Sequence, residues 1–358
     1  MSAPVRDGAQ STSGPAPRAS GLRPLPLLVA VVALLGAMTG GLLVGAVDLP
    51  VRGMLLELLD RVPGVRVDSG LSQLQANLLL EIRLPRVLAA AMVGGLLAIA
   101  GAGYQGVFRN PLADPYLLGA AAGAGVGATA TIVLFPGAPA TTVPVAAFVG
   151  ALAGVALASA LGSVAGGRGK ATLLLAGVAV SAFLSAVQTF LMQRDAQELR
   201  RIYSWVLGGV AAADGPRLWA LLPYAAVSVL VLLLHGRLLD VLGVGDEEAT
   251  ALGLSARRIR FLVLAAASLA TAVAVAAGGL IGFVGIVVPH VVRRLAGPSY
   301  RAVLPLSLLA GAAFLVLADV LARTAVAPGE LPLGVVTAFI GGPFFVVVLR
   351  SMRGRAGV

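Results

Sequence analysis

Residues 116–167 read YLLGAAAGAGVGATATIVLFPGAPATTVPVAAFVGALAGVALASALGSVAGG and carry no charged side chain over 52 positions. A single helix of this length would measure about 78 Å, whereas the hydrocarbon core of a bilayer is about 30 Å thick. We therefore expect the chain to fold back on itself at Pro136-Gly137-Ala138-Pro139, because proline and glycine favour turns. The stretch predicts two adjacent membrane spans.

The rest of the chain has the same character. Hydrophobic residues make up 58% of the 358 residues, charged residues 12%, and the mean hydropathy is +0.96. Soluble domains carry about 45–50% apolar and about 25% charged residues. The apolar content excludes a disordered chain, and the absence of cysteine excludes a disulfide scaffold. We predict further spans over residues 25–47, 87–107, 171–193, 218–235, 302–322 and 331–349, and one full and one short, glycine-broken span within residues 261–292.

The fold class that follows is an all-α polytopic membrane protein with about ten transmembrane helices in one domain, residues 24–350. Residues 1–23 are interpreted as a disordered basic tail and residues 351–358 as a short C-terminal tail. Residues 48–86 are interpreted as too polar to span. An even number of spans places both tails on one side, and sixteen of the 26 Lys and Arg residues then lie in the cytoplasm, as the positive-inside rule favours.

The net charge of +10 is spread between apolar runs, so no nucleic-acid partner is expected. The predicted spans contain one carboxylate, Asp319, four residues before Arg323. Either the two form a structural i,i+4 pair or Asp319 acts directly in function. Buried ionisable groups mark proton and sodium pathways, so their scarcity disfavours an ion-coupled carrier. The two histidines, His235 and His290, are far apart, which disfavours a metal site or a metal-dependent membrane enzyme.

Residues 166–172, GGRGKAT, resemble a phosphate-binding loop but depart from it twice. Val164 stands where the motif needs its first glycine, and Ala171 where it needs a magnesium-binding hydroxyl. No strand is predicted before this segment. We therefore expect that another chain supplies the energy for any powered transport.

The polar segment 236–260 contains the pattern most informative about function. Asp246, Glu247 and Glu248 open a short helix, where the helix dipole favours negative charge. Gly253 is suited to end that helix, and Ser255 to cap the next one. A short helix held at the membrane surface fits docking into a groove on a soluble partner. The alternative is an ordinary solvated loop.

From span 1 to the C-terminus the chain resembles the permeases of ATP-binding-cassette importers for ferric siderophores, haem and vitamin B12. Seven stretches in the same order carry the resemblance, and only the basic tail lies outside it. They are RLPR (83–86), NPLADP with LG (110–115 and 118–119), LLAGVA (174–179), WVLGG (205–209), the acid-to-arginine segment 246–260, GFVGIVVPH (282–290) and ELPLGVVT (330–337).

The resemblance implies a type II importer permease in the cytoplasmic membrane, with both termini cytoplasmic, that is not itself an enzyme. A second copy or a close paralogue would complete the pathway. A cytoplasmic ATPase dimer would bind ATP and Mg²⁺, an extracytoplasmic binding protein would deliver the substrate, and no cofactor would bind directly to the permease. The implied substrate is an iron(III)–siderophore complex, with haem or cobalamin as alternatives and ion-coupled transport as a distant one.

Residue roles also follow from the resemblance. The coupling segment 236–260 would contact the ATPase through Glu247, Ala249, Gly253, Leu254 and Arg257.

A cytoplasmic gate would be formed by Asn110, Pro111 and Leu112, which otherwise form a plain turn. Three outward arginines, Arg83, Arg86 and Arg323, would pair with acids of the binding protein; interfacial anchoring is the alternative for the first two.

A second gate would fall at residues 169–172, but Lys170 and Ala171 replace the small hydroxyl residues of some relatives, so it is not assigned.

Overall fold

The computed structural model describes residues 23–45, 47–62, 64–139, 141–164, 170–195 and 197–353. The N-terminal tail up to residue 22, residues 354–358 and most of the phosphate-loop-like segment lie outside the described residues. Helices form the described chain, and it contains no strand. The elements are α1 Pro24–Leu43, α2 Val51–Asp60, α3 Gln73–Asn77, the π-helical turn η1 Leu78–Arg83, α4 Leu84–Phe108, the 3-10 turn η2 Pro115–Leu118, α5 Ala120–Leu134, α6 Thr142–Val164, α7 Lys170–Arg194, α8 Leu199–Val206, α9 Gly215–Leu234, α10 Gly236–Val244, α11 Asp246–Ala251, α12 Ala256–Gly278, α13 Val284–Ala296, α14 Tyr300–Thr324 and α15 Leu333–Arg353.

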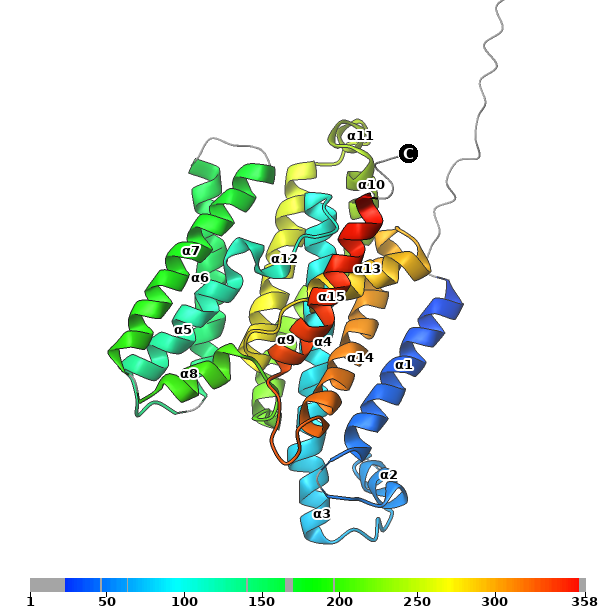
Figure 1. Cartoon of the computed structure of the whole chain (residues 1–358). Helices are drawn as coiled ribbons and strands as arrows, with labels where there is room; N and C mark the ends of the chain where they lie inside the picture. Colours follow the sequence, from blue (N-terminus) through cyan, green and yellow to red (C-terminus); the bar gives the residue numbers. More distant parts are fainter. Residues whose placement is uncertain are drawn as a thin grey trace, which may run out of the picture.

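Within the described residues, seven helices are long and apolar enough to cross a membrane, and α5 and α15 are shorter apolar helices. The short helix α13 corresponds to the predicted short span that follows α12. The polytopic all-α class is therefore confirmed, and the predicted break in the uncharged stretch lies between α5 and α6. In Figure 1, α10 and α11 lie at the upper end of the bundle and α2, α3 and α8 at the lower end; we call these the α11 end and the α2 end. The first residues of α1 and the last of α15 both lie at the α11 end.

The second span differs from the prediction. It runs as one continuous helix through α3, η1 and α4, over 36 residues from Gln73 to Phe108, rather than beginning at residue 87. The helix therefore begins earlier than predicted, and its 36 residues would measure about 54 Å, so part of it extends beyond a hydrocarbon core of about 30 Å. The physical reason is that Arg83 is buried and Arg86 nearly so, with acceptors supplied by other helices. A hydropathy pattern counts such charges as if they faced lipid.

The segment 236–260 also differs from an open loop. Helix α10, helix α11 and the first turns of α12 occupy almost all of it. Gly253 has φ +73°, and the amide of Leu254 donates to the carbonyl of Ala249 at 2.9 Å. The side chain of Ser255 accepts from the amide of Arg258 at 3.4 Å. Gly253 thus lies at the end of α11 and Ser255 caps the start of α12, as expected.

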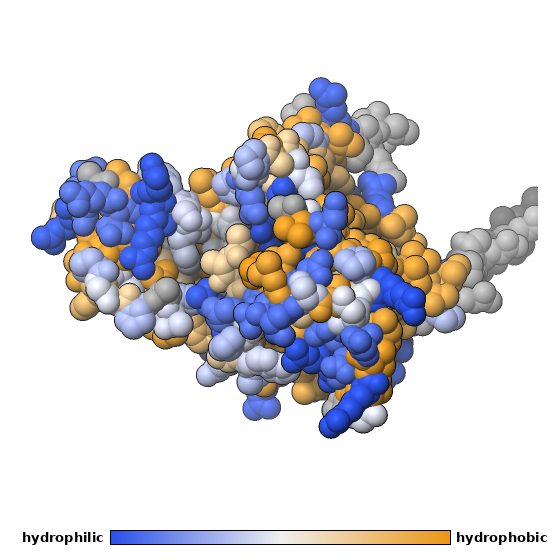
Figure 2. Space-filling view, turned by 90° about the horizontal axis from the view of Figure 1, so that it is seen from below, coloured by the Kyte–Doolittle hydropathy of each residue, from blue (hydrophilic) through white to orange (hydrophobic). Residues whose placement is uncertain are grey.

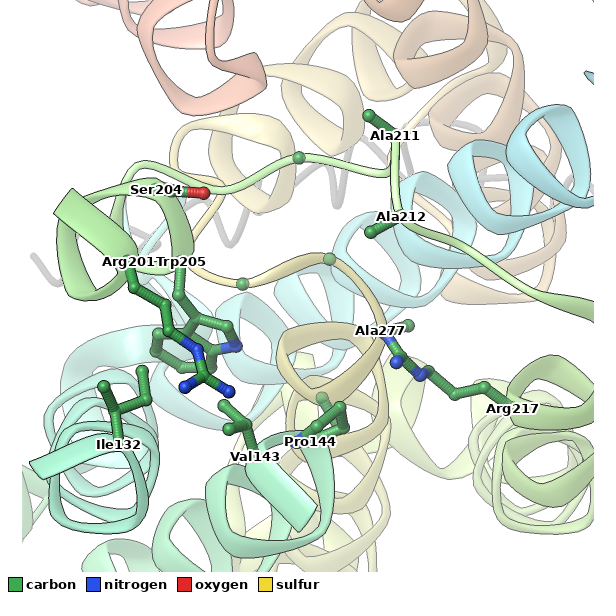
Figure 3. Close-up of a pocket in the computed structure, with 14 residues that line it drawn as sticks. Ile132, Val143, Pro144, Arg201, Ser204, Trp205, Ala211, Ala212, Arg217 and Ala277 are labelled. Atoms are coloured by element: carbon green, nitrogen blue, oxygen red, sulfur yellow. The ribbon is translucent and has the colours of Figure 1, made fainter. Parts of the chain in front are cut away.

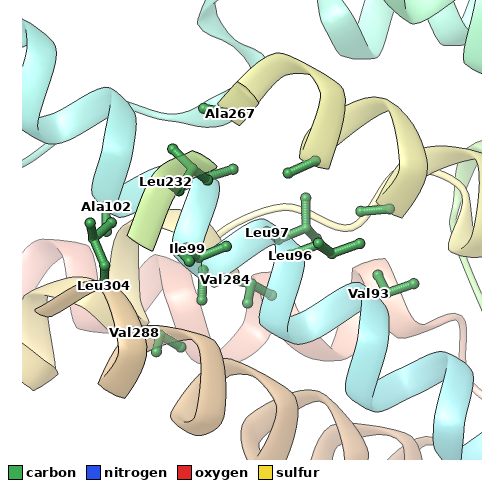
Figure 4. Packing of buried hydrophobic residues seen from close by; sticks show 14 of the residues in the cluster. Val93, Leu96, Leu97, Ile99, Ala102, Leu232, Ala267, Val284, Val288 and Leu304 are labelled. Atoms are coloured by element: carbon green, nitrogen blue, oxygen red, sulfur yellow. The ribbon is translucent and has the colours of Figure 1, made fainter. Parts of the chain in front are cut away.

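Helix α4 forms the centre of the bundle and packs against α12, α13 and α14 (Figure 4). Its middle residues, including Leu96, Leu97 and Ile99, are at most 2% exposed. A Cβ added at Gly94 would overlap the backbone of Gly311 on α14, and close packing through small residues is what drives helix association in lipid. The abundant glycines of the sequence therefore act here as packing residues.

The glycine-broken span is an interrupted helix whose gap is buried at Gly279 and Ile281 and half-buried elsewhere. Helix α12 ends at Gly278 and α13 begins at Val284, after Phe283 with φ +68°. The hydroxyl of Tyr116 donates to the carbonyl of Ile281 and accepts from its amide, both at 3.1 Å. The amide of Gly209 donates to the carbonyl of Gly278 at 2.8 Å. Irregular backbone inside a membrane protein requires such internal partners.

Candidate functional site

Helix α11 lies at one end of the bundle and presents an exposed surface. Glu247, Gly253 and Arg257 are exposed, and Leu254 is half-buried. Ala249, in contrast, is fully buried, so it seats α11 on its neighbours rather than facing outward. The side chain of Leu252, which the sequence did not single out, is 68% exposed. Four of the five predicted coupling residues thus lie on an accessible surface, together with an apolar side chain.

The predicted gate follows α4 directly and is joined to α11 by one side chain. Arg109 ends α4 in the left-handed conformation, with φ 50°. Its Nε donates to the carbonyl of Leu242 on α10 at 2.7 Å, and its Nη2 donates to Asp246 of α11 at 2.7 Å. Arg260 of α12 also donates to this carboxylate. The sequence did not reveal this contact, because 137 positions separate Arg109 from Asp246.

The gate residues themselves form a compact turn. The side chain of Asn110 accepts from the amide of Leu112 at 3.0 Å, and its carbonyl accepts from the amide of Ala113 at 3.1 Å. Pro111 is exposed and Leu112 half-buried. Since Arg109 precedes this turn directly, its contacts with α10 and α11 lie next to residues 110–112.

The three predicted docking arginines come together at the α2 end, but each is engaged by its own chain. Arg83 donates to the carbonyls of Leu42 and Leu43 at 2.9 and 3.4 Å, and to that of Val47. Arg323 donates to the carbonyls of Gly41 and Val44 at 2.8 and 3.0 Å. These carbonyls belong to the end of α1 and the residues that follow it, so both arginines hold the C-terminus of α1, where the helix dipole favours cations.

Arg86 forms the centre of a charge cluster with Asp319, Glu330 and Arg323. Its Nε is 3.0 Å from both carboxylate oxygens of Asp319, and its Nη1 and Nη2 donate to Glu330 at 2.9 Å. Asp319 is also 3.4 Å from Arg323, the predicted i,i+4 partner. The Asp319 side chain is 1% exposed, the Arg86 side chain 11% and that of Glu330 44%. Hydrogen bonds from Arg86 hold the pKa of Glu330 below its usual value.

The structure therefore contains the i,i+4 pair of Asp319 and Arg323, which was one of the two alternatives for Asp319. The distance from Asp319 to Nε of Arg86, 3.0 Å, is shorter than that to Nε of Arg323, 3.4 Å. Arg86 lies 233 positions away, and the sequence did not indicate this contact. The docking role of the three arginines stays a prediction, and the geometry adds a condition to it. A partner's acids would have to replace acceptors that the chain itself supplies.

Three of the sequence motifs meet beside the interrupted helix. An apolar cavity of about 590 Å³ is lined by Val206 and Leu207, by Leu280, Gly282 and Phe283, and by Gly334, Val335, Ala338 and Phe339. The amides of Leu333 and Gly334 donate to the carbonyls of Gly208 and Leu207, both at 3.1 Å. The motif residues thus build one wall from three distant segments.

No group of three or more His, Cys, Asp or Glu side chains that could hold a metal ion occurs in the described part of the chain. The ring of His290 packs edge-on against that of Phe344, with the ring centroids 5.6 Å apart. Nδ1 of His235 lies 2.7 Å from the carbonyl of Val231. Both histidines therefore have structural contacts.

The comparisons with known proteins assign this polytopic helical bundle, with its interrupted span and its short exposed helix at one end, to the membrane transport subunits. The model of the FecCD transport family matches residues 29–351, so the chain belongs to this family. It is 46% identical over 275 residues to the cobalamin import system permease protein BtuC of Halobacterium salinarum, covering 77% of this chain and 74% of that protein. It is 40% identical over 275 residues to the Fe(3+) dicitrate transport system permease protein FecD of Escherichia coli, covering 77% and 86%.

A solved structure shares the whole architecture. It is an inward-facing conformation of a metal-chelate type ABC transporter, with 28% identity and a TM-score of 0.80, and the match covers 92% of this chain and all of the other. The expected family and fold are therefore confirmed: the chain is a permease of the ABC importer class. Relatives of similar identity carry names with different substrates, so family membership leaves the substrate open.

Proposed function

We propose that this permease moves a metal chelate inward by alternating access, driven by ATP hydrolysis on a partner. The observation that carries the proposal is the link from α11 through Arg109 to the turn 110–112. Helix α11 would dock into a groove of a cytoplasmic ATPase through Glu247, Gly253, Leu254 and Arg257. When the ATPase moves α11, the Arg109 contacts would pull on the gate turn.

The α2 end would face the binding protein. Figure 2, viewed from this end, shows hydrophilic side chains over much of the surface, with hydrophobic ones beside them. Docking through Arg83, Arg86 and Arg323 would require the partner's carboxylates to compete with Glu330 and with the carbonyls at the end of α1. The Glu330 side chain is 44% exposed, so Arg86 is the first arginine we expect to exchange partners.

A second copy of the chain, or a close paralogue, would complete the pathway. Large apolar side chains on α7 and α15 are exposed, among them Phe183 at 63%, Phe190 at 64% and Phe339 at 73%. Phe339 also lines the cavity of about 590 Å³ beside the interrupted helix. A partner subunit on these faces would cover the side chains and enclose the cavity between the two copies.

An iron(III)–siderophore complex is the substrate we propose, with haem as an alternative. Cobalamin is the second candidate, because the relative with 46% identity is a cobalamin import permease. Uptake into proteoliposomes that contain the permease, the ATPase and the binding protein tests the proposal, with iron-loaded siderophore, haem and cobalamin offered in turn.

We expect uptake of one chelate only when ATP and the ATPase are present. Transport by the permease alone, with collapse on adding a proton uncoupler, would replace this function by ion-coupled transport. Uptake of cobalamin in preference to ferric siderophore would keep the importer and change its substrate.

Sidedness has its own test, because the chain has no cysteine. Leu252 beside α11 and Leu74 on α3 are 68% and 79% exposed, so a cysteine at either position is accessible. We expect Leu252→Cys to react with a membrane-impermeant maleimide only in inverted vesicles, and Leu74→Cys only in intact cells. Labelling of both from one side would contradict the orientation.

A further inference from the structure

A cavity of about 290 Å³ opens at the α2 end, away from the charge cluster around Arg86. Its walls come from the start of α6, the end of α12, the start of α9 and helix α8. The side chains that decide its chemistry are Arg201 and Trp205 on α8, Arg217 on α9, and Pro144 and Ala277 (Figure 3). Since the other lining residues are small or apolar, the two arginines supply its charge.

The two guanidinium groups enter the cavity from opposite sides (Figure 3). Their nearest acids along the chain are Glu198, 3.8 Å from Arg201, and Asp214, 3.5 Å from Arg217. Charge-assisted hydrogen bonds from arginine measure about 2.7–2.9 Å, so neither acid forms one here. Nε of Arg217 is buried and has no hydrogen-bond partner. The cavity therefore retains donors for an anion.

The anion chemistry that fits is a phosphate group. A guanidinium presents a planar fork of N–H donors, which matches the oxygens of phosphate. Two forks on opposite sides can hold the two unbridged oxygens of a phosphodiester. A carboxylate offers two oxygens as well, so the surroundings of the cavity decide between the two anions.

The surroundings of the cavity indicate that the phosphate belongs to a lipid. An exposed apolar side chain follows the lining residue Arg217 closely on α9: Trp219, two positions further, is 73% exposed. One turn deeper, the rings of Phe148 on α6 and Tyr224 on α9 meet with centroids 5.4 Å apart and join the two helices. Tryptophan at the end of a membrane helix is typical of the headgroup level. A headgroup in the cavity would thus have apolar surface beside it for its acyl chains.

We infer that this cavity binds the phosphate headgroup of an anionic phospholipid, held between Arg201 and Arg217. The permease with its ATPase is placed in bilayer discs of phosphatidylcholine with or without phosphatidylglycerol, and retained lipid is measured by native mass spectrometry. Both headgroups carry a phosphodiester, but the choline cation of phosphatidylcholine offsets that charge and would face two arginines. We therefore expect phosphatidylglycerol to be retained over phosphatidylcholine by at least about tenfold, as the loss of one charge-assisted contact gives. The double substitution Arg201→Gln with Arg217→Gln is expected to abolish this preference.

Arg200→Gln is the matched control, because Arg200 is exposed on the same helix and does not line the cavity; it should keep the preference. Arg201→Gln alone serves if the double variant fails to fold, since the Arg201 side chain is 41% exposed. Equal retention in wild type and variants would overturn the inference. So would thermal stabilisation in detergent by inorganic phosphate without a lipid preference, which would assign a small anion. Loss of binding-protein docking in the variants with lipid retention unchanged would assign the arginines to that partner instead.

Discussion

Replacing Arg109 by alanine is expected to lower ATP-driven uptake about tenfold while the permease still assembles with its ATPase. The hydrogen bond from Arg109 to the carbonyl of Leu242 contributes about 1.5–3 kcal/mol, as bonds from charged groups do. The contact with Asp246 adds at most about 1 kcal/mol, since both side chains are partly exposed. The lower end of the first range, about 1.5 kcal/mol, corresponds to a loss of about tenfold in uptake per ATP hydrolysed. Uptake per ATP hydrolysed in proteoliposomes measures the effect.

Arg237→Ala is the control for this substitution, because Arg237 is an exposed arginine on α10 at the same end of the bundle. It should leave the ratio of uptake to hydrolysis unchanged. Asp246→Asn in the Arg109→Ala background also removes the pair with Arg260, so any further loss reports that second contact and not the Arg109 link. If Arg109→Ala keeps full coupling, the gate turn is moved by another route and the proposed transmission is wrong.

The sequence predicted those parts of the fold that depend on local pattern. An uncharged stretch longer than the membrane requires a reversal, and α5 and α6 have one at the proline-rich turn. Residues 261–292 were too long for one helix and short for two, and the chain breaks between Gly278 and Val284. Gly253 and Ser255 act through their own backbone and side-chain chemistry, so their roles could be read without tertiary structure.

The contacts that connect distant segments could not be predicted in this way. The charge cluster joins Arg86 to Asp319 and Glu330, which are 233 and 244 positions away. Nothing in the local pattern around Arg86 distinguishes an arginine with internal acceptors from one that faces water. For the same reason the sequence placed the beginning of the second helix too late, and it did not indicate the acceptors that the chain supplies to Arg83 and Arg86.

Because the three arginines already have acceptors in their own chain, docking at the α2 end would require them to exchange partners. Arg83 and Arg323 stabilise the end of α1 through its carbonyls, while Arg86 has carboxylate partners on α14 and in the following loop. A docking partner that withdrew either of the first two would remove hydrogen bonds that tie the end of α1 to η1 or to α14. Withdrawing Arg86 from Glu330 leaves Asp319 in place. The exchange that disturbs the bundle least is therefore at Glu330.

The largest effect on stability is expected from Asp319→Asn. The carboxylate of Asp319 is buried between Arg86 and Arg323, and its loss leaves two cations close together with Glu330 as their remaining acid. Removing one partner of a buried ion pair costs about 3–5 kcal/mol. A chain of this size loses about 2 °C of melting temperature per kcal/mol, so we expect a drop of about 6–10 °C for the purified protein.

Glu330→Gln is the matched substitution within the same cluster, and the comparison isolates burial as the cause. Both changes remove one carboxylate from Arg86 while preserving side-chain volume, but the Glu330 side chain is 44% exposed and that of Asp319 1%. Water and salt screen an exposed pair, so its loss is expected to cost at most about 1 kcal/mol, or about 2 °C. Equal losses for the two variants would show that the cluster is solvated throughout. In that case the second span could not begin with buried arginines, and Arg83, Arg86 and Arg323 would be free for a partner without any exchange.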